Sequence, residues 1–213
     1  MNVAEIFPTP IFVDNYTEKE TVKNLVLKEI KKQKPEPHLC SPELLHYGNT
    51  SDGSIFRKKE FKSFKQWCEK SCEKFITEVL GYELEDGVFV TDSWINVCNK
   101  NGFQQPHFHT NSFISGTYYV NFDKDSGHSP LTFQSPFNAS FVSRPSINLS
   151  KKNPTPYNTD SNCYPQNGDL VLWQSHLLHG HFGNESDNRI SVSMNFMPKV
   201  ISTGQYGFRV SPY

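Results

Sequence analysis

Two histidines stand one residue apart in the stretch QQPHFHTNSFISGTYYVNF, which spans residues 104–122. On a β-strand, residues i and i+2 face the same side, so His107 and His109 are expected to project together, with Phe108 on the opposite face. An isolated His-x-His pattern is more simply interpreted as two hydrogen-bonded surface residues. A third histidine in a similar setting is therefore needed to indicate a metal site.

That third histidine lies in the stretch GDLVLWQSHLLHGHFGNESDNRISVSMNF, residues 168–196. A strand is expected here, followed by His176, His179 and His181 and then by a second strand. Two histidines from one strand and one from a distant strand make one face of a site. Its other positions stay open for substrate and dioxygen, as expected of non-haem iron. His179 is the best third ligand. His176 and His181, the histidines on either side of it, are expected to be exposed loop residues.

An arginine ten residues after His179 makes the site more specific. Arg189 is followed at i+2 by Ser191, so a guanidinium and a hydroxyl share one face of an apolar strand. Such a pair suits a carboxylate bound near the metal. An arginine alone would more often be a surface charge.

Five segments in this order, SWINV, PHFH, SGTYYV, GDLVLWQSHLLHG and NRISVSMNF, resemble the iron(II)- and 2-oxoglutarate-dependent oxygenases, especially a group of small members. The likeness covers about residues 90–198, and IFPTP near the start also fits that group. The same stretches are more distantly similar to aspartyl/asparaginyl β-hydroxylases. Each motif is weak alone, and the common order and spacing make the resemblance specific.

The resemblance implies that His107 and His179 ligate iron(II), and that Arg189, assisted by Ser191, binds the distal carboxylate of 2-oxoglutarate. It also implies the reaction. Dioxygen and 2-oxoglutarate are consumed, succinate and CO2 are released, and the substrate is hydroxylated. We expect that substrate to be an amino acid, a peptide or protein, or another small molecule.

Tyr118 and Asn96 fall where related enzymes place further co-substrate contacts. Tyr118 and Tyr119 face opposite sides of the strand, so a shift of one residue in strand register exchanges the tyrosine that faces the site. Trp94 shares the face of Asn96 and is expected either to line the pocket or to pack in the core.

His109 departs from the broad family, because most members have Asp or Glu two residues after the first histidine. Asp92 and Asp123, the nearest candidate replacements, do not fit the spacing. We expect His109 to complete a three-histidine metal face, since an imidazole at i+2 can reach a metal held by its neighbour. The alternative is that water fills this position, as in the β-hydroxylases that lack the carboxylate.

The elements that must position these residues are short strands after residue 81. They are β-branched or aromatic and are bounded by turn residues. Their sequences are GVFVTDSWINVC, SFISGTYYVNF, PLTFQS, SFVSRP, GDLVLWQS and RISVSMNFMP. An edge strand is expected in IFPTPIFVDNY, because its prolines exclude a central position.

Two helices are expected before these strands. The first, TEKETVKNLVLKEIKKQ, opens with a capping-box pattern of Thr17 and Glu20. The second covers roughly residues 57–80, where apolar residues recur at intervals of three and four and Gly81 follows as a stop. His38, His46 and His128 lie in expected loops, so they are predicted to be solvated.

The expected fold is mainly β (α+β): a double-stranded β-helix, or cupin-like jelly roll, with N-terminal helices packed outside. Its length suits one domain over residues 1–213, with the helical layer at about 15–82 and the jelly roll at about 88–200. The polar loop at 146–167 is expected to shape the entrance of the site.

Composition excludes several classes of protein. The formal net charge is −1 and the pI is near 6.7, which gives no basic field for nucleic acid or an anionic membrane. The five cysteines form no CxxC pair, no apolar stretch is long enough to cross a membrane, and MNVAEIFPTP lacks a secretory pattern. A soluble, cytoplasmic protein is expected.

Two other functions fit parts of the pattern. A three-histidine, cupin-type dioxygenase would bind its organic substrate directly and need no 2-oxoglutarate; His109 favours it, whereas Arg189 and Ser191 do not. A non-catalytic jelly-roll binding module, whose histidines hold zinc or nothing, belongs to a different class.

Overall fold

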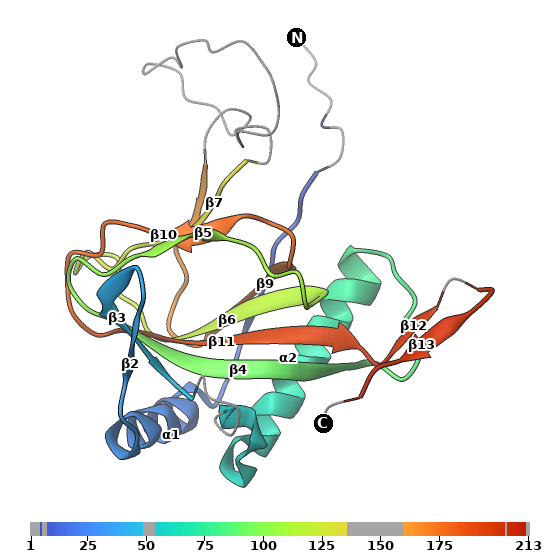
Figure 1. Ribbon diagram of the computed structural model, residues 1–213, viewed down its shortest axis with the longest axis horizontal. Helices are drawn as coiled ribbons and strands as arrows, with labels where there is room; N and C mark the ends of the chain where they lie inside the picture. The colour runs from blue at the N-terminus through green and yellow to red at the C-terminus, as the bar shows by residue number, and fades with distance from the viewer. Residues whose placement is uncertain (1–4, 6–7, 49–53, 136–159, 203, 212–213) are drawn as a thin grey trace.

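Two antiparallel sheets lie face to face in the computed structural model of the chain (Figure 1). The structure describes residues 5, 8–48, 54–135, 160–202 and 204–211. The strand expected at SFVSRP and most of the 146–167 loop lie outside these residues.

The larger sheet has seven strands. They are β1 (Phe12–Asn15), β2 (Glu36–His38), β3 (Ser41–Tyr47), β4 (Val88–Cys98), β6 (Ile114–Asn121), β9 (Asp169–Gln174) and β11 (Arg189–Pro198). Their order across the sheet is β1-β9-β6-β11-β4-β3-β2. The segment predicted as an edge strand therefore does form one edge, because β1 pairs with β9 alone.

The smaller sheet has four strands, β5 (Gln104–His107), β7 (Leu131–Phe133), β8 (Ser161–Cys163) and β10 (His179–His181). Their order is β5-β10-β7-β8. From β4 to β11 the chain passes repeatedly between the two sheets, as a jelly roll requires. The predicted fold class is confirmed.

The helices cover the face of the larger sheet that points away from the smaller one (Figure 1). They are α1 (Lys19–Lys32), two 3-10 turns η1 (Ile55–Arg57) and η2 (Lys59–Phe61), α2 (Lys62–Lys74) and a π-helical turn η3 (Phe75–Val79). The helical segment predicted at 57–80 is thus three kinds of helix in succession. Gly81 ends it with φ 74°, as expected of a glycine stop.

The start of α1 differs from the prediction. Helical structure begins at Lys19, and the side chain of its N-cap residue, Glu18, makes no capping hydrogen bond. The predicted capping box is therefore wrong. A different contact holds α1 in place: the buried carboxylate of Glu29 forms ion pairs with Lys32 in its own helix and with Lys58 between η1 and η2.

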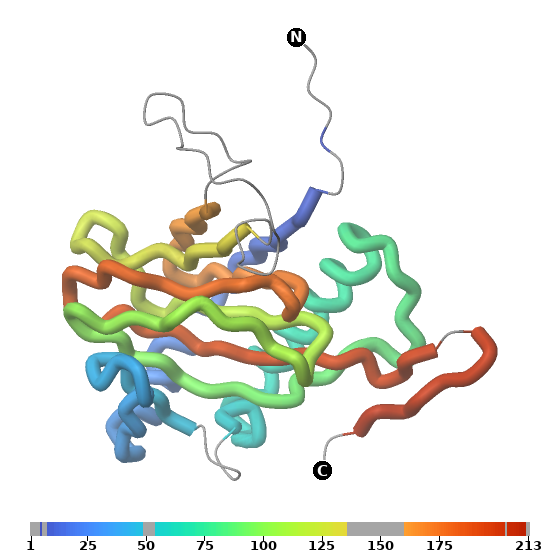
Figure 2. The backbone as a smooth tube through the Cα atoms, turned by 45° about the horizontal axis from the view of Figure 1, so that its top comes forward, coloured from blue at the N-terminus to red at the C-terminus, as the bar shows by residue number. Residues whose placement is uncertain are grey.

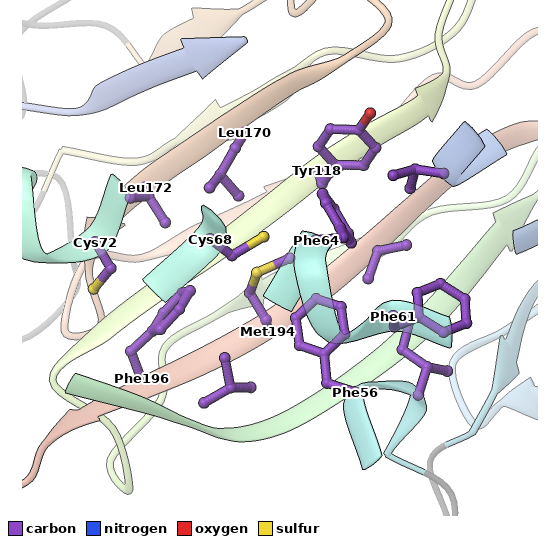
Figure 3. Close-up of a cluster of buried hydrophobic side chains, with 14 of the residues drawn as sticks. Phe56, Phe61, Phe64, Cys68, Cys72, Tyr118, Leu170, Leu172, Met194 and Phe196 are labelled. Atoms are coloured by element: carbon purple, nitrogen blue, oxygen red, sulfur yellow. The ribbon is translucent and has the colours of Figure 1, made fainter. Parts of the chain in front are cut away.

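The main core lies between the helices and the larger sheet (Figure 3). Side chains of the helical layer, such as Phe61 and Phe64, meet Tyr118 from β6 and Met194 from β11. Complete burial of each large apolar side chain contributes roughly 1.5–3 kcal/mol. Because alternate strand residues face opposite sides, the other face of these strands is left to line the space between the sheets.

The last two strands leave the body of the protein. β12 (Val200–Ser202) and β13 (Gly207–Arg209) form a separate two-stranded hairpin that projects beyond both sheets (Figures 1 and 2). It carries no part of the site described below. None of the helices described in the chain is both long and apolar enough to cross a membrane.

Candidate metal centre

Three histidines gather at one end of the space between the sheets. His107, His109 and His179 each offer a ring nitrogen, and these atoms all lie within 4.8 Å of one another. The ring centroids are 4.3 Å apart for His107 and His179, 5.1 Å for His107 and His109, and 5.3 Å for His109 and His179. Three nitrogens this close can share one metal ion.

Strand pairing brings two of these histidines together. His107 on β5 lies directly opposite His179 on β10. The two strands approach closely because Gly180 has no side chain: a Cβ there would lie 2.5 Å from the carbonyl oxygen of Gln104. A distance this short is not tolerated, so the pairing depends on glycine at this position.

Backbone carbonyls fix the protonation of two rings. Nδ1 of His107 lies 2.9 Å from the carbonyl oxygen of Gln105, and Nδ1 of His179 lies 2.8 Å from that of Leu177. A carbonyl can only accept a hydrogen bond, so each Nδ1 donates its proton and each Nε2 keeps its lone pair. This is the arrangement in which an imidazole ligates a metal.

His109 reaches the site by a different route from the one predicted. β5 ends at His107, so His109 is not on the same strand and lies in the connection that follows. Its backbone N–H donates to the carbonyl oxygen of Ser175, at 2.9 Å. The Ser175 hydroxyl in turn bonds Ser112 and Ser115, at 2.6 and 2.8 Å, which anchors this connection to β6.

Burial keeps the imidazoles of His109 and His179 neutral. It is the main cause, with the charge of the neighbouring His107 next, of a pKa near 4 for His109 and near 3 for His179. A metal competes with protons for the same lone pairs. Low pKa values therefore favour metal ligation at neutral pH.

Arg189 lies beside this group at the start of β11 and is only 3% exposed. Its Nε–H donates to the carbonyl oxygen of Ser129, at 2.9 Å. The guanidinium carbon lies 5.4 Å from the centre of the Tyr119 ring. No carboxylate of the described residues forms an ion pair with it.

A cavity of about 260 Å³ joins these groups, with all three histidines and Arg189 in its wall. Ser191 and Asn96 also line it, from directly paired positions on β11 and β4. The amide nitrogen of Asn96 donates to Ser193 at 2.9 Å, and the Trp94 indole donates to the amide oxygen of Asn96 at 3.1 Å. Six of the predicted site residues thus face one cavity, and Trp94 faces it too. The six are His107, His109, His179, Arg189, Ser191 and Asn96.

Comparison with known families agrees with this site. Residues 92–195 match the model of a family described as "Putative 2OG-Fe(II) oxygenase". The match assigns this segment, which holds all three histidines and Arg189, to the 2OG-Fe(II) oxygenases. The predicted superfamily is therefore confirmed, and with it the assignment as an enzyme. A comparison with curated proteins gives no significant match.

Solved structures share the fold of this oxygenase at low sequence identity. HygX from Streptomyces hygroscopicus, with nickel, 2-oxoglutarate and hygromycin B bound, has a TM-score of 0.59 and 12% identity over 89% of this chain and 83% of its own. A prolyl-4-hydroxylase from Pseudomonas putida has 0.57 and 12%, over 89% and 93%. The α-ketoglutarate-dependent epimerase SnoN from nogalamycin biosynthesis has 0.62 and 9%, over 96% and 87%.

One predicted residue of the oxygenase lies elsewhere. Tyr118 belongs to the core under the helices, with its ring 4.6 Å from that of Phe64 (Figure 3). Tyr119 lines the cavity instead. Tyr118 therefore does not face the cavity, contrary to its predicted position. The phenolic oxygen of Tyr119 is buried without a hydrogen-bond partner among the described residues, and burial raises its pKa to about 12.

Three histidines predicted to be solvated or exposed are instead buried or lie in the cavity wall. His128 is held by the backbone of Asp123 and Asp187, and His181 bonds the Ser129 hydroxyl at 3.1 Å. His46 lies on β3 and lines the cavity, where its Nε2 is buried without a partner among the described residues. Its pKa falls to about 4, chiefly through burial. His176 is exposed, as predicted.

Sequence reasoning missed His46 and gave Asp92 no place in the cavity wall. His46 belongs to SPELLHY, whose mixed polarity gives little strand signal. Asp92, in contrast, could have been placed, because Asp92, Trp94 and Asn96 are spaced two apart on a confidently predicted strand and therefore share a face.

Proposed function

We propose that this oxygenase binds iron(II) through His107, His109 and His179, and couples oxidation of 2-oxoglutarate to hydroxylation of an organic substrate. Per turnover, one C–H bond becomes C–OH while dioxygen and 2-oxoglutarate are consumed and succinate and CO2 are released. The iron with its bound co-substrate supplies the oxidising chemistry. The protein supplies binding, orientation and exclusion of water.

The observation that carries this proposal is the buried Arg189 without a carboxylate partner among the described residues. An unpaired buried charge is costly, so such a group calls for an anionic ligand. The ligand must fit beside three imidazoles that can hold a metal. A short dicarboxylate, with one end at the metal and the other at Arg189, meets both requirements.

Neighbouring hydroxyls support the same assignment. Ser191 shares the strand face of Arg189, and the ring of Tyr119, whose hydroxyl is buried, has its centre 5.4 Å from the guanidinium carbon. Both hydroxyls can donate to a carboxylate, and a charged acceptor makes such bonds stronger than neutral ones. Asn96, held by Trp94 and Ser193, is positioned to orient the co-substrate from the side of β4.

The three histidines are held in position by different contacts. His107 and His179 are oriented by their own backbone carbonyls on paired strands, which fixes both rings before metal binds. His109 sits on a connection anchored by serine hydroxyls, and no side-chain hydrogen bond to its ring is formed within the described chain. We assign it as the third ligand in place of the acidic residue of most relatives.

Two rival functions are less well supported. A three-histidine dioxygenase independent of 2-oxoglutarate would leave the buried Arg189 without an anionic ligand. A zinc-binding module would need neither Arg189 nor the cavity. The substrate of the proposed hydroxylation is an amino acid, a peptide or another small molecule. Of two solved structures similar in fold, HygX has the small molecule hygromycin B bound and the other is a prolyl-4-hydroxylase.

The decisive experiment measures succinate made from 2-oxoglutarate. Purified protein should form it slowly without other substrate, and only when iron(II) and oxygen are both present. Anaerobic addition of iron(II) and 2-oxoglutarate should also produce a visible charge-transfer band. Succinate formation independent of iron, or no band and no turnover in metal-loaded protein, would contradict the proposal.

A further inference from the structure

The floor of the cavity carries opposite charges at its two ends. Arg189 pairs with Cys98 at one end of β4, and Asp92 lies six residues away on the same strand, about 20 Å along it. Asp92 supplies the one carboxylate in the wall of this cavity as far as the described residues define it. The histidine cluster borders the same cavity.

The surroundings of Asp92 leave its carboxylate available. It is half buried, and no lysine or arginine forms a salt bridge with it among the residues that the structure describes. Burial raises its pKa, while a hydrogen bond from the Ser93 backbone and the charge of Arg57 act in the opposite direction. A bound cation would offset the cost of this partial burial.

An aromatic ring lies next to this carboxylate. Trp94 is two residues along β4, so it shares the face of Asp92, and it also lines the cavity. Its indole N–H is already used by Asn96, so the ring faces are what it offers to a ligand. A carboxylate beside an indole favours a cation such as ammonium or guanidinium, through charge and through cation–π attraction.

Trp94 also connects this end of the cavity to the proposed metal ligands. Its ring centroid lies 6.3 Å from that of His109. A group held at Asp92 and Trp94 therefore lies next to the histidine cluster, at the end opposite Arg189. The two ends can accept two different molecules at once.

We propose that Asp92 and Trp94 bind a basic nitrogen of the prime substrate, so that a carbon a few bonds from this nitrogen is presented to the reaction centre. This inference rests on the proposed function, because it takes the space beside the triad to be the substrate site. It narrows the substrate class to amines and guanidines. Neutral and acidic substrates lack the group that Asp92 recognises.

The test uses small cations as probes, because weak binding is enough to measure. Ligand-observed NMR titrations compare n-butylammonium with 1-butanol, and methylguanidinium with methylurea, on the full chain with and without zinc(II) and 2-oxoglutarate. Each cation should bind wild-type protein more tightly than its neutral analogue. Equal binding of the cation and the neutral analogue, or no binding of either cation, would overturn the inference.

Variants assign the binding to these two residues. Asp92→Asn keeps the side-chain shape and should weaken cation binding about tenfold or more, since a charge-assisted contact is lost. Trp94→Phe should keep more of the affinity than Trp94→Leu, because it retains an aromatic face. Glu83→Gln, at an exposed carboxylate outside the cavity, is the matched control and should bind like wild type.

Two outcomes would separate this inference from the proposed function. Unchanged cation binding in Asp92→Asn, with a melting temperature close to that of wild type, would overturn the substrate assignment even if succinate is formed. Cation binding without succinate formation would instead contradict the proposed reaction alone. A further comparison of free L-lysine with a Gly-Lys-Gly peptide identifies whether the basic nitrogen belongs to a metabolite or to a polypeptide.

Discussion

His107 and His179 are directly paired residues on neighbouring antiparallel strands, with ring centroids 4.3 Å apart and each Nδ1 on a backbone carbonyl two residues before it. The backbone of β5 and β10 thus sets both the distance between two ligands and the orientation of their rings. The remaining proposed ligand, His109, is positioned by a connection and not by a strand. This difference leads to separate predictions for the two kinds of ligand.

Removal of the strand ligand His179 should abolish metal binding. His179→Ala takes away an Nε2 whose lone pair is directed by the Leu177 carbonyl, and no other described residue can replace it at that strand pair. Metal content after dialysis, measured by atomic absorption, should fall close to zero. His176→Ala, at an exposed neighbour, should retain metal like wild type. A His179→Ala protein with stoichiometric metal would show that His179 is not a ligand.

Substitution of His109 distinguishes ligation from a water-filled position. If His109 binds the metal, His109→Ala should weaken iron(II) affinity by more than the roughly 10–100-fold typical of losing an outer-shell partner. His109→Asp should recover part of that loss, because it restores the two-histidine, one-carboxylate face. Titration of iron(II) under anaerobic conditions measures both. An unchanged affinity in His109→Ala would show that water occupies this position.

Arg189→Met should raise the 2-oxoglutarate concentration needed for half-maximal succinate formation by about tenfold or more. The change removes a charge-assisted contact worth roughly 1.5–3 kcal/mol while keeping much of the side-chain length. Arg209→Met is the control, because Arg209 lies on the projecting hairpin, away from the site, and pairs with Asp86. An unaltered requirement for 2-oxoglutarate in Arg189→Met would remove Arg189 from the proposed site.

Tyr118 and Tyr119 provide a matched pair. Tyr119→Phe should raise the 2-oxoglutarate requirement a few-fold, as expected from loss of one hydrogen bond of about 1 kcal/mol. Tyr118→Phe should change neither this requirement nor the free energy of unfolding by much, because the Tyr118 hydroxyl is buried without a partner among the described residues. Steady-state kinetics and urea unfolding measure the two effects. The opposite kinetic result would restore the original assignment of Tyr118.

Acid should loosen the contact between α1 and the short helical turns. Burial alone would raise the pKa of Glu29, but hydrogen bonds from Lys58, Lys32 and Gln33 outweigh it and lower the pKa from 4.5 to about 2. Because the folded-state pKa is depressed, this contribution is complete above pH 4.5 and is lost as the pH falls toward 2.

Glu29→Gln tests this contribution. Urea unfolding at pH 7 should show a lower free energy of unfolding than wild type, and the difference should shrink between pH 4.5 and 2. Glu20→Gln, at an exposed position on the same helix, should unfold like wild type at every pH. A Glu29→Gln protein as stable as wild type at pH 7 would mean that the ion pairs do not offset the burial of the carboxylate.

Sequence patterns predicted most of the elements that carry the site. Arg189 begins β11, as the apolar run RISVSMNFMP indicated, and the predicted helix at 17–33 corresponds to α1. The patterns were sufficient because these segments bury one face or both, which makes their periodicity strong. The fold class could be predicted for the same reason.

The sequence predictions were wrong where the alternation of polar and apolar residues does not distinguish one residue or element from the next. Seven successive residues of β6, from Ile114 to Val120, are buried, so no alternation of polarity separates Tyr118 from Tyr119. β3 forms because it pairs with β4, a long-range contact that its mixed sequence does not reveal, and His46 was therefore placed in a loop. The end of β5 before His109 is equally a matter of pairing and not of local propensity.

The missing side chain at Gly180 has a consequence for how this protein can change. Main-chain spacing at that point sets how closely β5 and β10 approach, so a residue with no ligand atom determines the distance between the proposed ligands His107 and His179. Even a single added methyl group would have to move the two strands apart. The distance between the two imidazoles would then change although no donor atom is altered.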